Sequence, residues 1–479
     1  MLIFEIYDII INKNYELEDN KIMIVKKNGI YQTEIIDLSS DGQGIGKVDG
    51  FTVFVEGTIP GDVAEIKIIK TNKTYGYGKI IKIISPSIDR IKAKCGIAKK
   101  CGGCSLQYMD YNAQLKQKQK IVSDCLERIG GVKNIVEITE EIIGMDNPYN
   151  YRNKAQFPVK KNASQNIADI GFFVKRSHDI INLDTCDISH KINDEIINIF
   201  REFINRNIKK FPPYNEENHT GLIRHIFTRT GFYSGEIMVC VVVNGDGLPE
   251  SNELIKKLSK INGMTSIMLN INKEKTNVVL GHKNKILWGK DFITDYINDK
   301  KFKISVNSFY QINPVQTEKL YAKAIEFAEV NKNDVCIDAY CGIGTISIML
   351  ASHVKKVYGV EIVPQAIFDA VENAELNNIK NVEFITGKSE EIIPELIKNG
   401  ENIDVIIVDP PRKGCDIKLI ESIIESKIKK LVYISCDPAT LSRDVKLLTQ
   451  GAYELKKIQP VDMFPHTMHV ETVALLQFI

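Results

Sequence analysis

A cysteine follows a predicted buried strand, at the kind of position where α/β enzymes carry out their chemistry. The run Lys430-Leu-Val-Tyr-Ile434 predicts a strand, and Ser435-Cys436-Asp437-Pro438 follows it directly. The carboxyl ends of parallel strands form the edge at which open α/β sheets bind ligands. A thiolate is a good nucleophile at neutral pH once its pKa is lowered. Cys436 is therefore a candidate nucleophile, whereas Cys240 and Cys336, inside apolar runs, are expected to be small buried side chains.

A glycine turn upstream predicts a binding site for a second reactant. The strand-like run 334–340 leads into Cys341-Gly-Ile-Gly-Thr345, and Glu361 ends the next predicted strand, 23 residues past Asp338. Such a turn lets a helix start approach a ligand closely, and a carboxylate at this spacing can hold ribose hydroxyls. Alone, the turn fits a dinucleotide site or a simple tight turn equally well. Because the third glycine of Gly-x-Gly-x-x-Gly is missing, S-adenosylmethionine is favoured over a nicotinamide cofactor.

Asp409 is a further acidic residue at the end of a predicted strand. Asp409 ends the fourth strand of this region, and Pro410 and Pro411 stiffen the loop after it.

Methylation of a uracil at C5 is a reaction that needs both a thiolate and a base. Uracil C5 is too weak a nucleophile to take a methyl group directly. Thiolate addition at C6 makes an enolate whose C5 can attack a sulfonium methyl, and a base must then remove the C5 proton.

The segment before the last predicted strand offers that base. Glu471 is the first candidate, because a carboxyl group in a dry pocket can have a raised pKa suited to proton abstraction. His469 is the second candidate. His466 is expected to be structural.

Four cysteines predict a metal centre away from Cys436. Cys95, Cys101 and Cys104 follow the pattern Cys-x5-Cys-x2-Cys, and the distant Cys186 supplies a fourth thiol. Four thiolates are enough for a cuboidal iron–sulfur cluster or a zinc ion. The spacing differs from Cys-x3-Cys-x2-Cys, which disfavours radical chemistry. The local sequence does not decide between iron–sulfur and zinc.

Length and composition indicate a multidomain globular protein. The 479 residues, 44% of them hydrophobic and 26% charged, predict two to four domains. No long apolar run predicts a membrane span, and the first residues lack the basic start and the cleavage site of a secretory signal. The ten unevenly spaced cysteines are typical of a reducing compartment. We expect a cytoplasmic protein with no membrane association, and a monomer.

The charge distribution suggests a nucleic-acid partner. The net charge is only +1, but ten basic residues and one acidic residue lie between Ile66 and Lys100. Tyr75 and Tyr77 lie within this run. Phosphates can bind the charges while bases stack on the rings, although a solvated lysine-rich face would look similar.

Periodicity divides the chain into four parts. Residues 1–27 show no motif and are expected to be an extension without an assigned function. Residues 28–86 alternate with period two between glycines and predict a small β-barrel of OB-like size. Residues 87–300 mix strands and helices and predict a central α+β domain. Residues 301–479 alternate strands and helices, which predicts a Rossmann-like parallel sheet, so the fold class is α/β.

With these residues assembled, the chain resembles the RNA uracil-5-methyltransferases, specifically the 23S ribosomal RNA branch that carries a TRAM barrel and an iron–sulfur cluster. The resemblance covers about residues 28–479. It rests on the Cys-x5-Cys-x2-Cys pattern, Tyr151–Pro158, Ser308–Asn313, Asp338–Thr345, Asp409–Gly414, Ser435–Asp444 and His469–Thr472.

The resemblance implies specific roles. Cys436 would be the nucleophile and Glu471 the base, and Gln311, Tyr340, Glu361 and Asp409 would line the S-adenosylmethionine site. The resemblance also implies that Cys95, Cys101, Cys104 and Cys186 hold a [4Fe-4S] cluster rather than zinc. Lys388 departs from the family, since relatives often carry an acid or amide there, and the adenine contact is left unassigned. The barrel and the cluster favour 23S ribosomal RNA as the partner, and a uridine in tRNA or another RNA is the alternative.

Two other classes of function compete with this interpretation. A pure RNA-binding protein would keep the barrel and the cluster but would not need both Cys436 and Glu471. A nicotinamide-dependent oxidoreductase would need the missing glycine.

Overall fold

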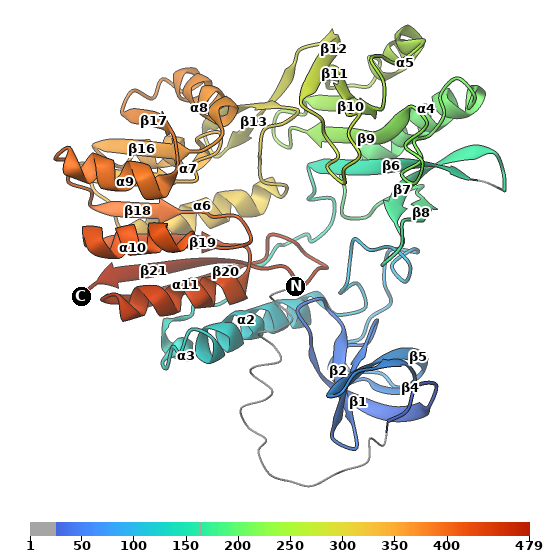
Figure 1. Ribbon diagram of the computed structural model, residues 1–479, viewed down its shortest axis with the longest axis horizontal. Helices are drawn as coiled ribbons and strands as arrows, with labels where there is room; N and C mark the ends of the chain where they lie inside the picture. The colour runs from blue at the N-terminus through green and yellow to red at the C-terminus, as the bar shows by residue number, and fades with distance from the viewer. Residues whose placement is uncertain (1–24, 163) are drawn as a thin grey trace. The chain divides into compact units, whose positions relative to one another are not determined.

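The computed structural model describes residues 25–162 and 164–479, so most of the expected extension lies outside the described residues. The chain forms two compact units, one ending at Arg90 and the other spanning Ile91–Ile479, and each is described by itself (Figure 1). No helix in the described ranges is both long and apolar enough to cross a membrane.

The first unit is a closed five-stranded barrel. Its strands are β1 (Ile30–Leu38), β2 (Gly44–Val48), β3 (Phe51–Val55), β4 (Val63–Thr71) and β5 (Tyr75–Ser85), in the order β1-β2-β3-β5-β4. Strands β2 and β3 form a hairpin. Asp49 and Gly50 both have positive φ, 49° and 85°, as a two-residue hairpin turn of this kind requires. Val25 already packs in the barrel core, upstream of the expected boundary at residue 28.

A buried carboxylate ties the end of this unit to the barrel. Asp62 is fully buried and accepts hydrogen bonds from the Ser87 backbone N–H and the Arg90 Nε, at 3.0 and 2.8 Å. Arg90 also donates to the Gly57 carbonyl at 2.8 Å. These bonds explain why the unit continues past the last strand to Arg90.

The second unit contains a seven-stranded sheet in its central part, in the order β12-β11-β10-β9-β6-β7-β8. Its elements are β6 (Lys154–Asn162), β7 (Ile167–Phe173), β8 (Ile180–Asn182), α4 (Ile192–Arg206), β9 (Ile223–Thr230), β10 (Ile237–Val243), α5 (Ser251–Leu258), β11 (Met264–Ile271) and β12 (Lys283–Gly289). Helices α4 and α5 contribute to the apolar core with one face of this sheet. Residues of the other face, such as Phe227 and Cys240, belong to the core that continues into the C-terminal part.

A second seven-stranded sheet lies in the C-terminal part, in the order β17-β16-β15-β18-β19-β21-β20. Its strands are β15 (Val335–Ala339), β16 (Lys356–Glu361), β17 (Val382–Thr386), β18 (Val405–Val408), β19 (Lys430–Ser435), β20 (Tyr453–Val461) and β21 (Glu471–Phe478). The first five strands are parallel, as the alternation of strands and helices predicts. Strand β21 instead runs antiparallel to both β19 and β20, so the sheet is mixed.

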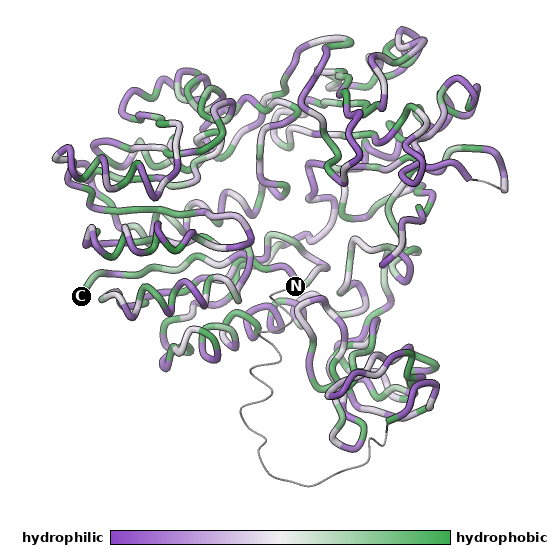
Figure 2. The backbone as a smooth tube through the Cα atoms, in the orientation of Figure 1, coloured by the Kyte–Doolittle hydropathy of each residue, from purple (hydrophilic) through white to green (hydrophobic). Residues whose placement is uncertain are grey.

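Helices cover both faces of this sheet. They are α6 (Pro314–Ala328), α7 (Thr345–Ala351), α8 (Pro364–Leu376), α9 (Ser389–Lys398), α10 (Ile417–Ser426) and α11 (Pro438–Gln450), and a short hairpin of β13 (Phe292–Ile297) and β14 (Lys300–Ser305) precedes them. Alternate strand residues enter two cores, one shared with α6, α7 and α8 and the other with α9, α10 and α11. Because both faces are buried, the inner strands are nearly continuous hydrophobic segments, as the green colouring of β18 and β21 in Figure 2 shows.

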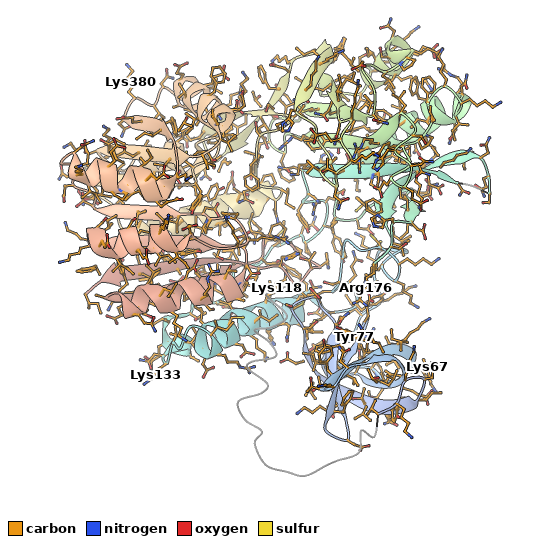
Figure 3. All side chains as sticks on the ribbon, viewed as in Figure 1. Lys67, Tyr77, Lys118, Lys133, Arg176 and Lys380 are labelled. Atoms are coloured by element: carbon orange, nitrogen blue, oxygen red, sulfur yellow. The ribbon has the colours of Figure 1, made fainter. Side chains whose placement is uncertain are left out.

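Helix α2 (Tyr111–Arg128) and the short α3 (Ile135–Ile138) come from the expected central domain but pack on the C-terminal sheet. Val122 and Leu126 of α2 are fully buried in the core of α10 and α11. Lys118 of α2, labelled in Figure 3, forms an ion pair with Asp462, and neither side chain is exposed. Lys118 Nζ also donates to the Phe464 carbonyl at 3.0 Å. The pair thus fixes the loop between β20 and β21 to α2.

We predict that Lys118→Met strongly destabilises the protein. Removing one partner of a buried ion pair leaves the other charge uncompensated and costs about 3–5 kcal/mol. The measurement is the free energy of unfolding from urea denaturation. Lys120→Met on the same helix is the control, because Lys120 pairs with Asp124 in solvent, and we expect it to cost less than about 0.5 kcal/mol. Equal losses in the two variants would contradict a structural role for the buried pair.

Candidate active site

Cys436 lies at the carboxyl edge of the C-terminal sheet, where the sequence predicted it. Strand β19 ends at Ser435, and α11 begins at Pro438. Asp437 caps that helix, since its carboxylate accepts the backbone N–H groups of Ala439 and Thr440 at 3.0 and 2.9 Å. The short link between strand and helix therefore holds Cys436 at the edge. Its side chain is partly exposed, so a ligand can reach it.

Glu471 lies next to Cys436 across two antiparallel strands. Ser435 of β19 pairs with Thr472 of β21. The next residue of each strand in this register is Cys436 on one side and Glu471 on the other. Glu471 is only 4% exposed, and its charge raises the pKa of Cys436. The structure thus brings together the two residues that the sequence proposed as nucleophile and base.

Buried acidic groups surround this pair. Burial and, to a smaller extent, the charge of Asp409 together raise the pKa of Glu471 to about 8. Burial likewise raises the pKa of Asp409 to about 7, with Asp338 as the neighbouring charge. Cys436 has a pKa of about 12, first because of burial and then because of Glu471 and Asp409. The thiol is therefore protonated in the free protein.

Asp409, Asp338, Gln311 and Tyr321 gather around the ends of β15 and β18. The Asp409 N–H donates to the Ala339 carbonyl at 3.4 Å, which continues the ladder of these two strands. Tyr321 on α6 is buried, and its hydroxyl is hydrogen-bonded to the Gln311 side chain. Burial raises the pKa of Tyr321, and the nearby Asp409 and Asp338 also raise it. Gln311 is mostly buried, and its main-chain carbonyl accepts from Asn153 Nδ2 at 2.9 Å. Tyr321 is a site residue that the sequence reasoning missed, since a tyrosine within a helix carries no local signal.

The glycine turn and Glu361 form a second part of the site. Gly342 and Gly344 have φ values of 56° and 81°, and a Cβ on Gly344 would lie 2.8 Å from the Phe384 ring. The Glu361 carboxylate accepts the Gly342 and Val363 N–H groups at 3.3 and 3.0 Å. Glu361 therefore shapes the turn that a ligand would approach.

The Asp338 carboxyl is held below the same turn. Asp338 is fully buried and accepts the Ser347 hydroxyl of α7 at 2.6 Å. Burial raises its pKa to about 7. Tyr340 lies between the two segments with a φ of 68° and is partly exposed.

Arg412 is a second residue to which the sequence analysis assigned no role, although it lies in the motif Asp409–Gly414. Its charge lowers the pKa values of both Cys436 and Glu471, against the effect of burial. The buried Asp444 carboxylate holds this loop by accepting the Cys415 N–H and the Tyr433 hydroxyl at 2.9 and 2.7 Å. Arg412 thus brings positive charge to a site that is otherwise rich in carboxyl groups.

The two histidines and Lys388 make contacts of other kinds. His469 is exposed and makes an edge contact with Phe464, with the ring centroids 5.9 Å apart. His466 is buried and stacks on Tyr149 at 4.6 Å, as a structural residue would. Lys388 is exposed and pairs with Glu391 at 2.9 Å.

Four thiols line one cavity in the N-terminal part of the second unit. Cys95, Cys101, Cys104 and Cys186 all face a space of about 240 Å³. Burial and, to a smaller extent, the other three thiols together raise the pKa of Cys104 to about 12. Within the described ranges, no group of three or more His, Cys, Asp or Glu side chains is arranged around a metal-ion position. Still, four mutually repelling thiolates fit a positively charged inorganic group, whose charge would offset their repulsion.

The segment after Cys104 contacts the loop that leads to Glu471. The Ser105 and Leu106 N–H groups donate to the His466 carbonyl at 3.0 and 2.9 Å. Gln114 of α2 donates to the Leu106 and Met109 carbonyls at 3.2 and 2.8 Å and accepts the His466 N–H at 3.0 Å. The thiol-bearing segment and the segment before Glu471 are therefore hydrogen-bonded to each other.

The chain is similar to known proteins over most of its length. Residues 110–478 match the family model described as tRNA (Uracil-5-)-methyltransferase, and residues 30–81 match the TRAM domain. An uncharacterized RNA methyltransferase of Clostridium tetani is 49% identical over 95% of this chain and 97% of its own length. One from Halalkalibacterium halodurans is 47% identical over 95% and 98%. The crystal structure of Pyrococcus abyssi tRNA (uracil-54, C5)-methyltransferase with S-adenosyl-L-homocysteine is similar, with a TM-score of 0.74 and 30% identity over 93% of this chain and 99% of its own.

We predict that Glu471→Gln weakens the pH dependence of stability. Glu471 binds its proton more tightly in the folded protein, where its pKa is about 8, than in an unfolded chain, where it is about 4.3. Its contribution to stability is thus complete below the unfolded pKa and is lost as the pH rises through about 8. The neutral glutamine does not titrate, so the variant loses less stability than the wild type over this range. Thermal unfolding midpoints across this pH range are the measurement.

Glu425→Gln is the control, because Glu425 is exposed on α10, and its pH profile is expected to parallel that of the wild type. A Glu471→Gln profile that also runs parallel to the wild type would contradict the raised pKa.

Proposed function

The chain belongs to the RNA (uracil-5-)-methyltransferase family and carries a TRAM domain, and we propose that it methylates C5 of a uridine in 23S ribosomal RNA. The activity common to the family is transfer of a methyl group from S-adenosylmethionine to C5 of a uracil in RNA. The observation that supports the catalytic assignment is the placement of Cys436 and Glu471 one residue beyond the last pair of β19 and β21, Ser435 with Thr472. The barrel and the four-thiol cavity together support ribosomal RNA, because the sequence resembles the ribosomal branch in these two features.

A uridine in tRNA is the second candidate. The solved relative from Pyrococcus abyssi is named as a tRNA (uracil-54, C5)-methyltransferase, and the likeness covers 93% of this chain.

In the proposed reaction Cys436 acts first. Its thiolate adds to C6 of the uracil, forming a C6–S bond and moving electron density to C5. Because its pKa is about 12 in the free protein, the thiol must release its proton to solvent in the bound complex. Arg412 favours the thiolate, whereas ionised Glu471 and Asp409 disfavour it. A protonated Glu471 removes one of these repulsions, and its raised pKa keeps it mostly protonated near neutral pH.

S-adenosylmethionine, when bound, supplies an electrophilic methyl group. Gln311, Tyr340, Glu361 and Asp409 would hold it. Glu361 accepts the Gly342 N–H at the glycine turn, Tyr340 precedes that turn, and Gln311 and Asp409 both lie near Tyr321. After the C5–CH3 bond forms, Glu471 must first release its own proton to solvent, and its carboxylate then takes the C5 proton. The electrons of the C5–H bond restore the C5=C6 double bond, and the C6–S bond breaks to release Cys436. Cys436 therefore opens the C5=C6 double bond of the uracil, and Glu471 restores it.

The four cysteines are proposed to bind a [4Fe-4S] cluster. They share one cavity, and burial and then the neighbouring thiols raise the pKa values of Cys95, Cys101 and Cys104, so these thiolates are electrostatically unfavourable without a positive charge beside them. Bound iron would offset this repulsion. We propose a structural role for the cluster, because the segment after Cys104 holds the His466 carbonyl.

We predict that Cys436→Ala abolishes methyl transfer and that Glu471→Gln stops the reaction at the covalent adduct. Transfer of radiolabel from S-adenosylmethionine to transcripts of 23S RNA and of tRNA measures the activity. An RNA–protein adduct stable to denaturing electrophoresis measures the covalent step. Without the base, the C5 proton stays in place and Cys436 is not released, so the adduct accumulates.

Cys125→Ala is the control, because Cys125 is a partly exposed cysteine on α2 and has no role in the proposed reaction. Full activity of Cys436→Ala would exclude the mechanism. Labelling of tRNA and not of 23S RNA would favour the second candidate and overturn the ribosomal assignment.

We predict that protein purified without oxygen contains iron and acid-labile sulfide in equal amounts and that Cys101→Ala loses both. Each thiol supplies one ligand, so removal of a buried thiol opens the cluster to loss. Metal and sulfide analysis is the measurement. Cys125→Ala again serves as the control and is expected to retain both elements. Stoichiometric zinc without sulfide would contradict the cluster.

A further inference from the structure

Three aromatic rings form a patch on the outer face of the barrel. Strands β3 and β5 pair in parallel, with Thr52 opposite Tyr75 and Phe54 opposite Tyr77. The ring centroids of Phe54, Tyr75 and Tyr77 lie 5.6 to 5.8 Å from one another. All three side chains are partly exposed. We call these three residues the aromatic patch.

The barrel core does not contain these rings. The residues that alternate with them, Gly76 and Gly78 on β5, are buried and have no side chains. A Cβ on Gly78 would lie 2.9 Å from Ile66 Cδ1, so the interior next to this strand is already filled. The sequence Tyr-Gly-Tyr-Gly therefore places all the side-chain volume of this part of the strand on the outside. Packing of the interior explains the glycines but not the choice of aromatic residues.

Lysines flank the aromatic patch on both sides. Lys47 of β2 pairs with Thr52, and Lys70 of β4 pairs with Tyr77. Further along β4 and β5, Lys67 pairs with Lys79. All four lysines are exposed, and within residues 25–162 and 164–479 none of them has an ion-pair partner. Figure 3 labels Tyr77 and Lys67 on this barrel.

We propose that the aromatic patch and its four lysines form a stacking platform for unpaired bases of the RNA substrate. This inference rests on the proposed function, since it requires an RNA partner. Aromatic side chains stack on exposed base faces of any sequence, and neighbouring cations bind the backbone phosphates. In a duplex the base faces are already stacked on one another and are not available to the rings. The platform thus favours single-stranded segments of the RNA substrate over duplex RNA.

The test uses full-length protein with a short fluorescein-labelled oligouridylate and with an RNA duplex of the same length. Affinities are measured by fluorescence anisotropy over a range of salt concentrations. We expect Tyr77→Leu to weaken binding of the oligouridylate by about 5- to 140-fold, the range reported for loss of one stacked base, and to leave duplex binding unchanged. Tyr77→Phe keeps the ring and is expected to bind as the wild type does.

Two further variants separate charge and folding from stacking. Lys70→Met is expected to lower the slope of log affinity against log salt by about 0.7, the effect of one phosphate contact on a single strand, whereas Tyr77→Leu leaves this slope unchanged. Ile36→Ala removes an exposed apolar side chain from β1 and is the control for nonspecific effects on the barrel. It is expected to bind like the wild type.

Unchanged oligouridylate affinity in Tyr77→Leu would overturn the platform, as would an equal loss of duplex binding. Misfolding of Tyr77→Leu would show as a lowered thermal midpoint, and the Phe54→Leu variant, measured against the same control, then decides by the same criteria. Methyl transfer to RNA is measured on the same wild-type preparation. Absence of transfer with intact oligouridylate binding would overturn the proposed function and not the platform.

Discussion

The reversed direction of β21 is the constraint on which the site depends. Five strands of the C-terminal sheet are parallel, so each brings its carboxyl end to the same edge. Cys436 follows one of these ends. A parallel last strand would present its C-terminal residues there and would place Glu471 at the opposite edge of the sheet. Because β21 is antiparallel, its first residue reaches the edge that holds Cys436, Asp409 and Glu361. The strand direction therefore determines whether the thiol and the carboxyl group can act on the same substrate atoms.

The burial of these groups at one edge of the sheet raises the free energy of their ionised forms. Asp338, Asp409 and Glu471 are acids in one poorly solvated region, and burial raises all three pKa values. The same environment keeps the Cys436 thiol protonated. Arg412 is the charge that opposes these effects, and its loop is attached to α11 through Asp444. A substrate that displaces water from the site changes this balance, so proton positions are coupled to binding. The arrangement is unfavourable for charge in the free protein and suits a reaction in which a thiol loses a proton and a carboxyl group gains one.

The loop before β21 must hold Glu471 in place, and contacts from distant parts of the chain do this. The buried pair of Lys118 and Asp462 fixes the start of the loop to α2. The His466 carbonyl accepts two N–H groups from the segment after Cys104. The four-thiol cavity and the site around Cys436 are thus connected through a hydrogen-bonded segment, without a shared ligand. This connection is consistent with the structural role proposed for a cluster at the cavity. It also explains why α2, which precedes the central sheet in sequence, packs on the C-terminal sheet.

The sequence by itself determined the α/β class, the barrel, the strand after which Cys436 lies and the acidic residues near it, because strand periodicity and glycine turns are local signals. It did not indicate the hairpin turn at Asp49 and Gly50. It did not indicate that α2 packs on the C-terminal sheet, that Arg412 and Tyr321 lie near the acidic groups, or that β21 is antiparallel. Only the tertiary structure decided these points. A buried strand has the same residue pattern in either direction, and the partner of an apolar helix face depends on which surface remains uncovered when the rest of the chain has folded.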